Sequence, residues 1–185
     1  AKYRDKNLKD SVEIARKANK PLHILGSNRL SLKWKRNGKY QPYFYPGKDL
    51  TFHGMIGGEE KNAVLRNSQA LIFPVLIHEA FGLAMIESLY LGCPVIGSHH
   101  GSVPELIIPE VGLSTSSKTQ MIEALKNIDQ FSRKACHEYA RDRFNHLVMS
   151  KKYISYYEQV LNGYPLHEQP PYCPGHLDNA LSLEE

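Results

Sequence analysis

Residues 70–106 read ALIFPVLIHEAFGLAMIESLYLGCPVIGSHHGSVPEL, and this stretch indicates the fold class. Residues 70–77 are almost continuously apolar, which is typical of a strand covered on both faces in a parallel sheet. FGLAMIESLYLG (81–92) predicts a helix that ends at a glycine, two residues before the helix-breaking Pro94. PVIGS (94–98) predicts a second short buried strand. This order of strand, helix and strand predicts a right-handed βαβ unit.

The same alternation continues on either side of this stretch. Residues 27–48 are polar, basic and rich in tyrosine, and we predict a loop with at most a helical turn there. The alternation predicts an α/β fold, namely a doubly wound, Rossmann-like parallel sheet with helices on both faces and a helical C-terminal end. The other helices are predicted at 7–20, 57–68, 117–128, 130–143 and 146–162, a helical turn at 103–107, and strands at 22–26, 49–54 and 112–116.

Residues 1–162 are expected to form one domain, and the Pro-rich, aperiodic residues 163–185 a tail or linker. A doubly wound domain ordinarily opens on a strand, whereas this chain opens on residues typical of the loop after one. We therefore expect the domain to lack its first strand. The absence of an initiator methionine fits a piece of a longer chain.

Composition excludes several classes of protein. The 185 residues are 42% hydrophobic and 23% charged, as in a globular protein. No apolar run approaches the roughly 20 residues of a membrane span, and three widely spaced cysteines favour reduced thiols in a cytoplasmic protein. The net charge of +4 suits an anionic small ligand, a membrane surface contacted peripherally, or nucleic acid. Nucleic acid is not expected, because no binding motif accompanies the charge.

The loop 76–81 is the predicted ligand site, because ligands of doubly wound sheets bind beyond the carboxyl ends of the strands. The helix that follows presents unpaired amides and a positive dipole end, which suit a diphosphate. Gly82 lacks a Cβ, so a ligand can approach that backbone closely.

Two glutamates flank this helix start. Glu79 lies in the loop, and Glu87 lies in the helix with its side chain tilted back toward the N-terminus. Carboxylates repel phosphate but accept hydrogen bonds from hydroxyls, so Glu79 fits a sugar ring and Glu87 a ribose. A ligand with hydroxyls on both sides of a diphosphate is a nucleotide sugar.

The central block is similar to the donor domain of retaining GT-B glycosyltransferases of family 4. The similarity extends from about residue 6 to about residue 161, and it rests on Glu79-x7-Glu87 with the embedded Phe81-Gly82-Leu83, on Gly92-x-Pro94-Val95-Ile96 and on Gly101-Ser102-Val103-Pro104-Glu105. The resemblance implies that Glu79 acts in catalysis on the transferred sugar, that Glu87 holds the ribose, and that the amides of Phe81, Gly82 and Leu83 hold sugar and diphosphate.

Further positions follow from the same resemblance. Lys6 is the lysine that neutralises the diphosphate, although Asn7 stands where the family has glycine. Gly54 lies where the backbone meets the nucleobase. The family's Gly-Arg pair is absent, which makes Arg4 a secondary candidate.

The remaining secondary candidates are Ser102, His99 and His100, the histidines as donors to phosphate or sugar. No metal site is expected, because the histidines lack partners at metal-ligand spacing and the family works without metal.

The predicted function is transfer of a hexose from a nucleotide diphosphate sugar to an acceptor, with retention of configuration and no cofactor. UDP-hexose is the favoured donor and GDP-mannose the other candidate. The acceptor, a saccharide, lipid or small molecule, is expected on a separate N-terminal acceptor-binding domain, so this chain alone should bind donor and be inactive. The alternatives are a non-catalytic nucleotide-sugar-binding or scaffold module, and a GT-B-like nucleotide-sugar epimerase.

Overall fold

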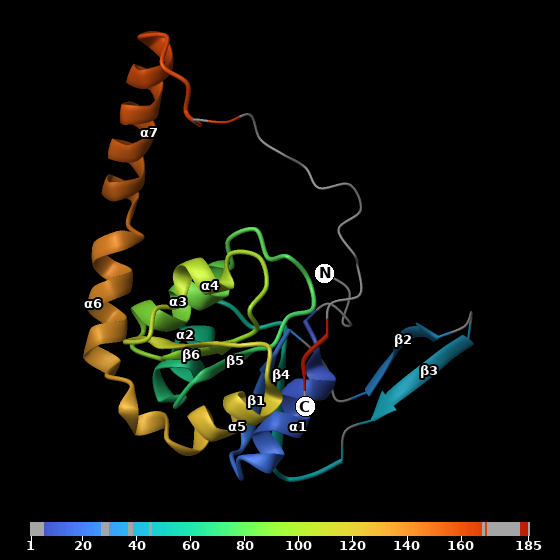
Figure 1. Cartoon of the computed structure of the whole chain (residues 1–185). Coiled ribbons are helices and arrows are strands. Elements are labelled where there is room, and N and C mark those ends of the chain that lie inside the picture. The colour runs from blue at the N-terminus through green and yellow to red at the C-terminus, as the bar shows by residue number, and fades with distance from the viewer. Residues whose placement is uncertain are drawn as a thin grey trace.

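Two small parallel sheets form the centre of the fold in a computed structural model, which describes residues 6–26, 30–36, 39–44, 46–167, 169 and 182–184 (Figure 1). In the first sheet β1 (Leu22–Leu25) pairs with β4 (Leu50–Gly54). The second has the order β5–β6–β7, formed by β5 (Leu71–Phe73), β6 (Val95–Gly97) and β7 (Gly112–Ser114). All three of these pairings are parallel, so the predicted α/β fold with strands alternating with helices is confirmed.

The helices occupy the predicted positions within a few residues at each end, where helix boundaries are least determined. They are α1 (Leu8–Lys17), α2 (Gly58–Asn67), α3 (Leu83–Tyr90), α4 (Val103–Leu106), α5 (Lys118–Lys126), α6 (Arg133–Arg143) and α7 (His146–Leu161), with a 3-10 turn at Ile128–Gln130.

Helices cover both faces of the three-stranded sheet. Val95 of β6 packs with Met85 of α3 and other buried side chains, whereas the next residue, Ile96, packs with Ile14 of α1 and Met121 of α5. Because consecutive strand residues point to opposite faces, these two clusters lie on opposite sides of the sheet. The prediction of helices on both faces is confirmed.

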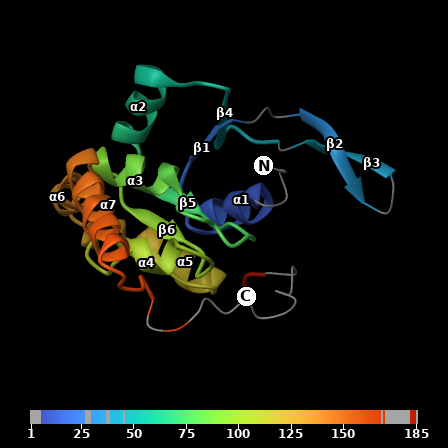
Figure 2. The ribbon, with the colours of Figure 1, turned by 90° about the horizontal axis from the view of Figure 1, so that it is seen from above.

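The prediction of a loop at 27–48 is wrong. The chain forms an antiparallel hairpin there, with β2 (Leu30–Arg36) paired to β3 (Lys39–Phe44), and the hairpin projects from the side of the body opposite α6 (Figures 1 and 2). The sequence carries the signal: LSLKW (30–34) alternates apolar and polar residues, and Asn37-Gly38 is the dipeptide that favours a two-residue hairpin turn. The abundance of polar residues obscured this alternation.

Buried cysteines agree with the predicted reduced thiols. Cys93 and Cys136 are free and buried, and burial raises the pKa of the Cys136 thiol to about 11. Such a thiol stays protonated at neutral pH and reacts slowly. Cys173 lies outside the described residues.

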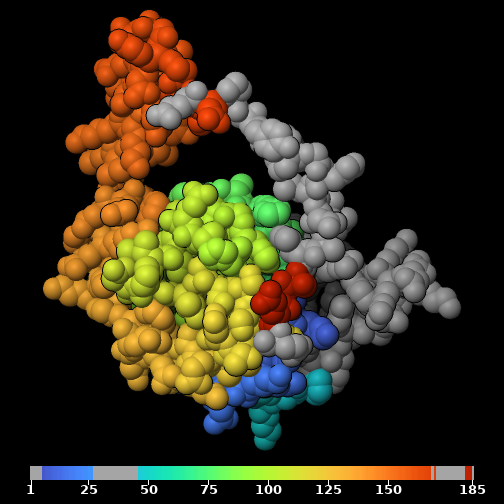
Figure 3. All heavy atoms as spheres, in the orientation of Figure 1, coloured from blue at the N-terminus to red at the C-terminus, as the bar shows by residue number. Residues whose placement is uncertain are grey.

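The C-terminal part leaves the body and returns to it. α7 projects beyond α6, and none of its residues is buried (Figure 1). Ser182–Glu184 lies against the body in the space-filling view (Figure 3). Glu184 forms a β-bridge with Ser117, and Leu183 packs on the hydrophobic cluster that contains Ile96. The predicted tail thus has at least one anchored segment. Among the helices of the described ranges, none has the length and apolar character that crossing a membrane requires.

Candidate functional site

The start of α3 is held in a conformation that requires glycine. Gly82 precedes the helix with φ 83°, a left-handed conformation, and a Cβ there would lie 2.3 Å from the Cε of Met85. This turn explains why α3 begins at Leu83 and not at the predicted residue 81. In the described part of the chain no side-chain hydrogen bond caps α3, so no side chain satisfies its first amides.

A second turn clamps the loop before α3. The amide of Ser102 donates to the carbonyl of Glu79 at 2.9 Å, and its hydroxyl donates to the carbonyl of Phe81 at 3.0 Å. Gly101 has φ 59°, and a Cβ there would lie 2.4 Å from the nitrogen of Glu79. The Gly101–Ser102 turn therefore fixes the backbone from Glu79 to Phe81.

Both predicted glutamates carry a lysine partner. The Nζ of Lys6 lies 2.5 Å from Oε2 of Glu79 and 5.1 Å from the centre of the Phe73 ring. The Nζ of Lys61, on α2, lies 2.9 Å from Oε1 of Glu87. Within each pair the positive charge of the lysine balances the negative charge of the glutamate. A diphosphate would compete with Glu79 for Lys6, because an ammonium group attracts either anion at this range.

These four charged side chains line one pocket of about 530 Å³, together with Gly82 and Leu83 of the α3 start. Its volume lies within the range of small-molecule sites. Apolar side chains of β1 and β5 also line it. The pocket lies where β5 ends and α3 begins, which is the predicted position.

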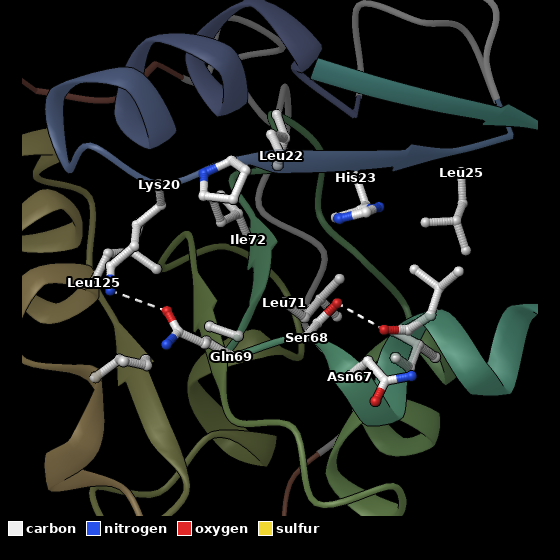
Figure 4. A pocket seen from close by; sticks show the side chains of 15 residues that line it. Lys20, Leu22, His23, Leu25, Asn67, Ser68, Gln69, Leu71, Ile72 and Leu125 are labelled. Atoms are coloured by element: carbon white, nitrogen blue, oxygen red, sulfur yellow. Dashed lines mark hydrogen bonds between the residues drawn. The ribbon is translucent and has the colours of Figure 1, made fainter. Parts of the chain in front are cut away.

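A smaller cavity of about 200 Å³ continues between β1 and β5 (Figure 4). Leu22 and Leu25 of β1, with Leu71 and Ile72 of β5, line it. Polar groups here are already engaged: Lys20 donates to Gln69 at 2.9 Å, and the hydroxyl of Ser68 donates to a helix carbonyl. The cavity marks the place where the two sheets do not hydrogen-bond to each other.

The secondary candidates lie in several places. Gly54 ends β4 with φ 68°, and its carbonyl accepts a hydrogen bond from the amide of Gly26, which lines the pocket. His99 contacts Ser114 at 3.1 Å and lines a different cavity, so the structure does not bring it to the pocket. Arg4 lies outside the described residues.

His100 is the candidate whose environment is most altered. Its Nε2 is buried without a hydrogen-bond partner in the described residues, and its ring lies 6.4 Å from that of His78. Burial, together with the neighbouring His78, lowers the pKa of His100, so the ring is neutral at pH 7. A neutral imidazole donates one hydrogen bond and accepts another but brings no charge to a phosphate. Among the described residues no group of three or more metal-ligating side chains is found.

Comparison with known proteins identifies the family. The family described as "Glycosyl transferases group 1" matches residues 3–143, which is most of the chain. The chain belongs to this family. It is a GT-B glycosyltransferase domain of family 4, as the central block predicted, and membership implies a nucleotide-sugar donor.

Two curated relatives of this glycosyltransferase domain illustrate its extent. It is 30% identical over 112 residues to the N-acetyl-alpha-D-glucosaminyl L-malate synthase of Bacillus anthracis. The matched stretch covers 57% of this chain and 29% of the relative. It is 26% identical over 118 residues to an uncharacterized 41.2 kDa protein of the cps region of Klebsiella pneumoniae, covering 60% and 33%. The chain therefore matches about a third of the length of these relatives.

Solved structures agree on the fold. AviGT4, a glycosyltransferase involved in avilamycin A biosynthesis, has a TM-score of 0.64 at 18% identity, with 86% of this chain and 48% of that chain covered. Sucrose-phosphate synthase from Thermosynechococcus elongatus has a TM-score of 0.63 at 21% identity, with 88% and 44% covered. Both likenesses concern the fold alone, and both show this domain as about half of the compared chain.

Lys61 was not among the residues predicted from the sequence. It lies on the helix predicted at 57–68, and nothing in the local pattern shows that its side chain reaches α3. The available signal is topological: the helix after β4 begins at the same edge of the sheets as α3 does, where site residues gather.

Proposed function

We propose that this domain holds the donor of a retaining glycosyltransferase, a nucleotide diphosphate sugar. The observation that carries the proposal is the pocket at the uncapped start of α3, which brings Lys6, Glu79 and Glu87 together from segments far apart in sequence. A basic group, free amides and two hydroxyl acceptors are the groups that a diphosphate between two sugars requires.

Each group has a proposed role. Lys6 exchanges Glu79 for the diphosphate, and with the amides of Phe81, Gly82 and Leu83 it stabilises the charge that develops on the leaving group. Glu87 accepts hydrogen bonds from the ribose. Glu79, once released by Lys6, contacts the transferred sugar as the bond to its anomeric carbon breaks, and the acceptor attacks from the same face.

The donor is proposed to be a UDP-hexose, with GDP-mannose as the other candidate. The acceptor is proposed to bind an N-terminal domain, so this chain alone binds donor without transfer.

The structure offers surfaces for further protein segments. On the exposed α7, Tyr153, Ile154, Tyr157 and Leu161 are large apolar side chains that no described residue buries.

The gap between β1 and β5 supports the proposal that the described residues lack the first strand of the fold. Doubly wound sheets commonly have the strand order 3-2-1-4-5-6. With an added first strand, the observed β4–β1 and β5–β6–β7 become this order, and the added strand falls between β1 and β5. We propose that such a strand fills the apolar cavity of Figure 4 and leaves the charged groups of the larger pocket for the donor.

Calorimetry with UDP, GDP and uridine tests the donor site. We expect one of the two diphosphates to bind one site per chain, and Glu87→Ala to weaken it by about tenfold to a hundredfold, since a hydrogen bond to a charged group contributes about 1.5–3 kcal/mol. Glu110→Ala, which removes an exposed glutamate outside the pocket, is the matched control and should bind as the wild type does. The proposal fails if folded wild-type chain binds neither diphosphate, or if both substitutions weaken binding equally.

A further inference from the structure

Lys61 points away from the acidic neighbours on its own helix. Glu59 and Glu60 lie beside it in the first turn of α2, and Glu59 pairs with Arg66. Lys61 instead spans 26 positions in sequence to Glu87 on α3 and lines the pocket with it. Its side chain is 27% exposed, so its apolar stem is largely covered while the ammonium group faces the site.

The contact engages only one oxygen of Glu87. Lys61 lies 2.9 Å from Oε1, and no contact of Oε2 with a described residue accompanies it. A glutamate on a helix surface has three rotatable side-chain bonds, and a fixed cation removes much of that freedom. The ion pair thereby restrains the carboxylate and leaves Oε2 as an acceptor in the pocket lining. A ribose offers two neighbouring hydroxyls, which such an oriented carboxylate can accept.

Charge gives the pair a second consequence. An unpaired Glu87 carboxylate beside the diphosphate would repel it, although solvent screens part of this repulsion because the Glu87 side chain is 48% exposed. Lys61 cancels this repulsion and leaves the acceptor oxygens in place. Lys6 does not serve Glu87 in this way, because it pairs with Glu79.

We propose that Lys61 is a positioning residue: it orients and neutralises Glu87 so that the donor site recognises the ribose hydroxyls of a nucleoside diphosphate. The inference rests on the proposed function, because it assigns Lys61 to the same donor site. It predicts that Lys61 acts chiefly through the ribose, with a smaller effect through the diphosphate.

The test measures binding of UDP and of 2′,3′-dideoxy-UDP by calorimetry to the wild type, Lys61→Met, Glu87→Gln and the double variant. Lys61→Met is expected to weaken UDP about tenfold, as for one charged hydrogen bond, and to weaken dideoxy-UDP much less. The double variant should bind UDP no more weakly than Glu87→Gln, because both changes remove one interaction. Lys61→Arg should retain most of the wild-type affinity.

Two controls keep the test specific. Lys126→Met removes a lysine from an exposed ion pair with Glu123 on α5, outside the pocket lining, and should leave UDP affinity unchanged. Thermal melts of Lys61→Met, followed by circular dichroism, show whether the variant keeps the fold.

Three results would overturn the inference. Equal loss for UDP and dideoxy-UDP would show that Lys61 contacts the diphosphate. Unchanged UDP affinity in Lys61→Met would show an ordinary surface pair. A folded wild type that binds neither UDP nor GDP would overturn the proposed function and this inference together, and that failure is visible before any variant is compared.

Discussion

A Lys6→Met chain is expected to bind UDP about tenfold to a hundredfold more weakly than the wild type. The substitution keeps an unbranched side chain to cover Phe73 but removes the ammonium group that lies 2.5 Å from Glu79. The loss should grow with phosphate number, so that UMP loses less than UDP and uridine loses nothing. Calorimetry at two salt concentrations measures it, because salt screens the attraction between Lys6 and the diphosphate.

Glu79→Gln breaks the same ion pair from the other side and provides the control. It leaves the cation free, so UDP affinity should be retained or increased. A parallel loss in Lys6→Met and Glu79→Gln would contradict the account, because it would mean that the pair itself holds the loop together and that Lys6 is not a phosphate ligand.

A Gly101→Ala substitution is expected to destabilise the domain by about 3 kcal/mol or more, because strain and a steric clash coincide. Position 101 has φ 59°, and the new Cβ would lie within 2.5 Å of both the nitrogen and the oxygen of Glu79. Relief requires movement of the 79–81 backbone, so UDP affinity should fall as well. Urea denaturation and calorimetry measure the two effects.

Gly58→Ala is the matched control for backbone strain. Its φ of 53° is close to that of Gly101, yet no atom lies within 4 Å of the added Cβ. We expect a loss of about 1 kcal/mol and unchanged UDP affinity, since only the left-handed conformation is penalised. If the two substitutions cost the same, the proposed clamp of Gly101 on Glu79 is wrong.

Much of the fold could be predicted from local pattern. The apolar run at 70–77 and the glycine and proline after residue 91 were sufficient to place β5, α3 and β6. The hairpin was missed because abundant polar residues hid its alternation. The helix start could not be placed to the residue, because the left-handed conformation of Gly82 is not evident from the apolar pattern.

The candidate site was predictable only in part. Glu79 and Glu87 lie eight residues apart, so one helix start brings them together. The Lys6–Glu79 pair joins residues 73 positions apart, and the Lys61–Glu87 pair joins two helices. Contacts of this kind depend on tertiary packing, which local periodicity does not encode.

Backbone amide chemical shifts test the central claim most directly, namely that the start of α3 holds the diphosphate of the donor. UDP titrated into nitrogen-15-labelled chain should shift the amides of Phe81, Gly82 and Leu83 most, with smaller shifts near Lys6 and Glu87 and none along α7. UMP should shift the three amides less, and uridine least. Shifts confined to other regions, such as the cavity beside β7, would contradict the account, as would an unchanged spectrum at millimolar UDP.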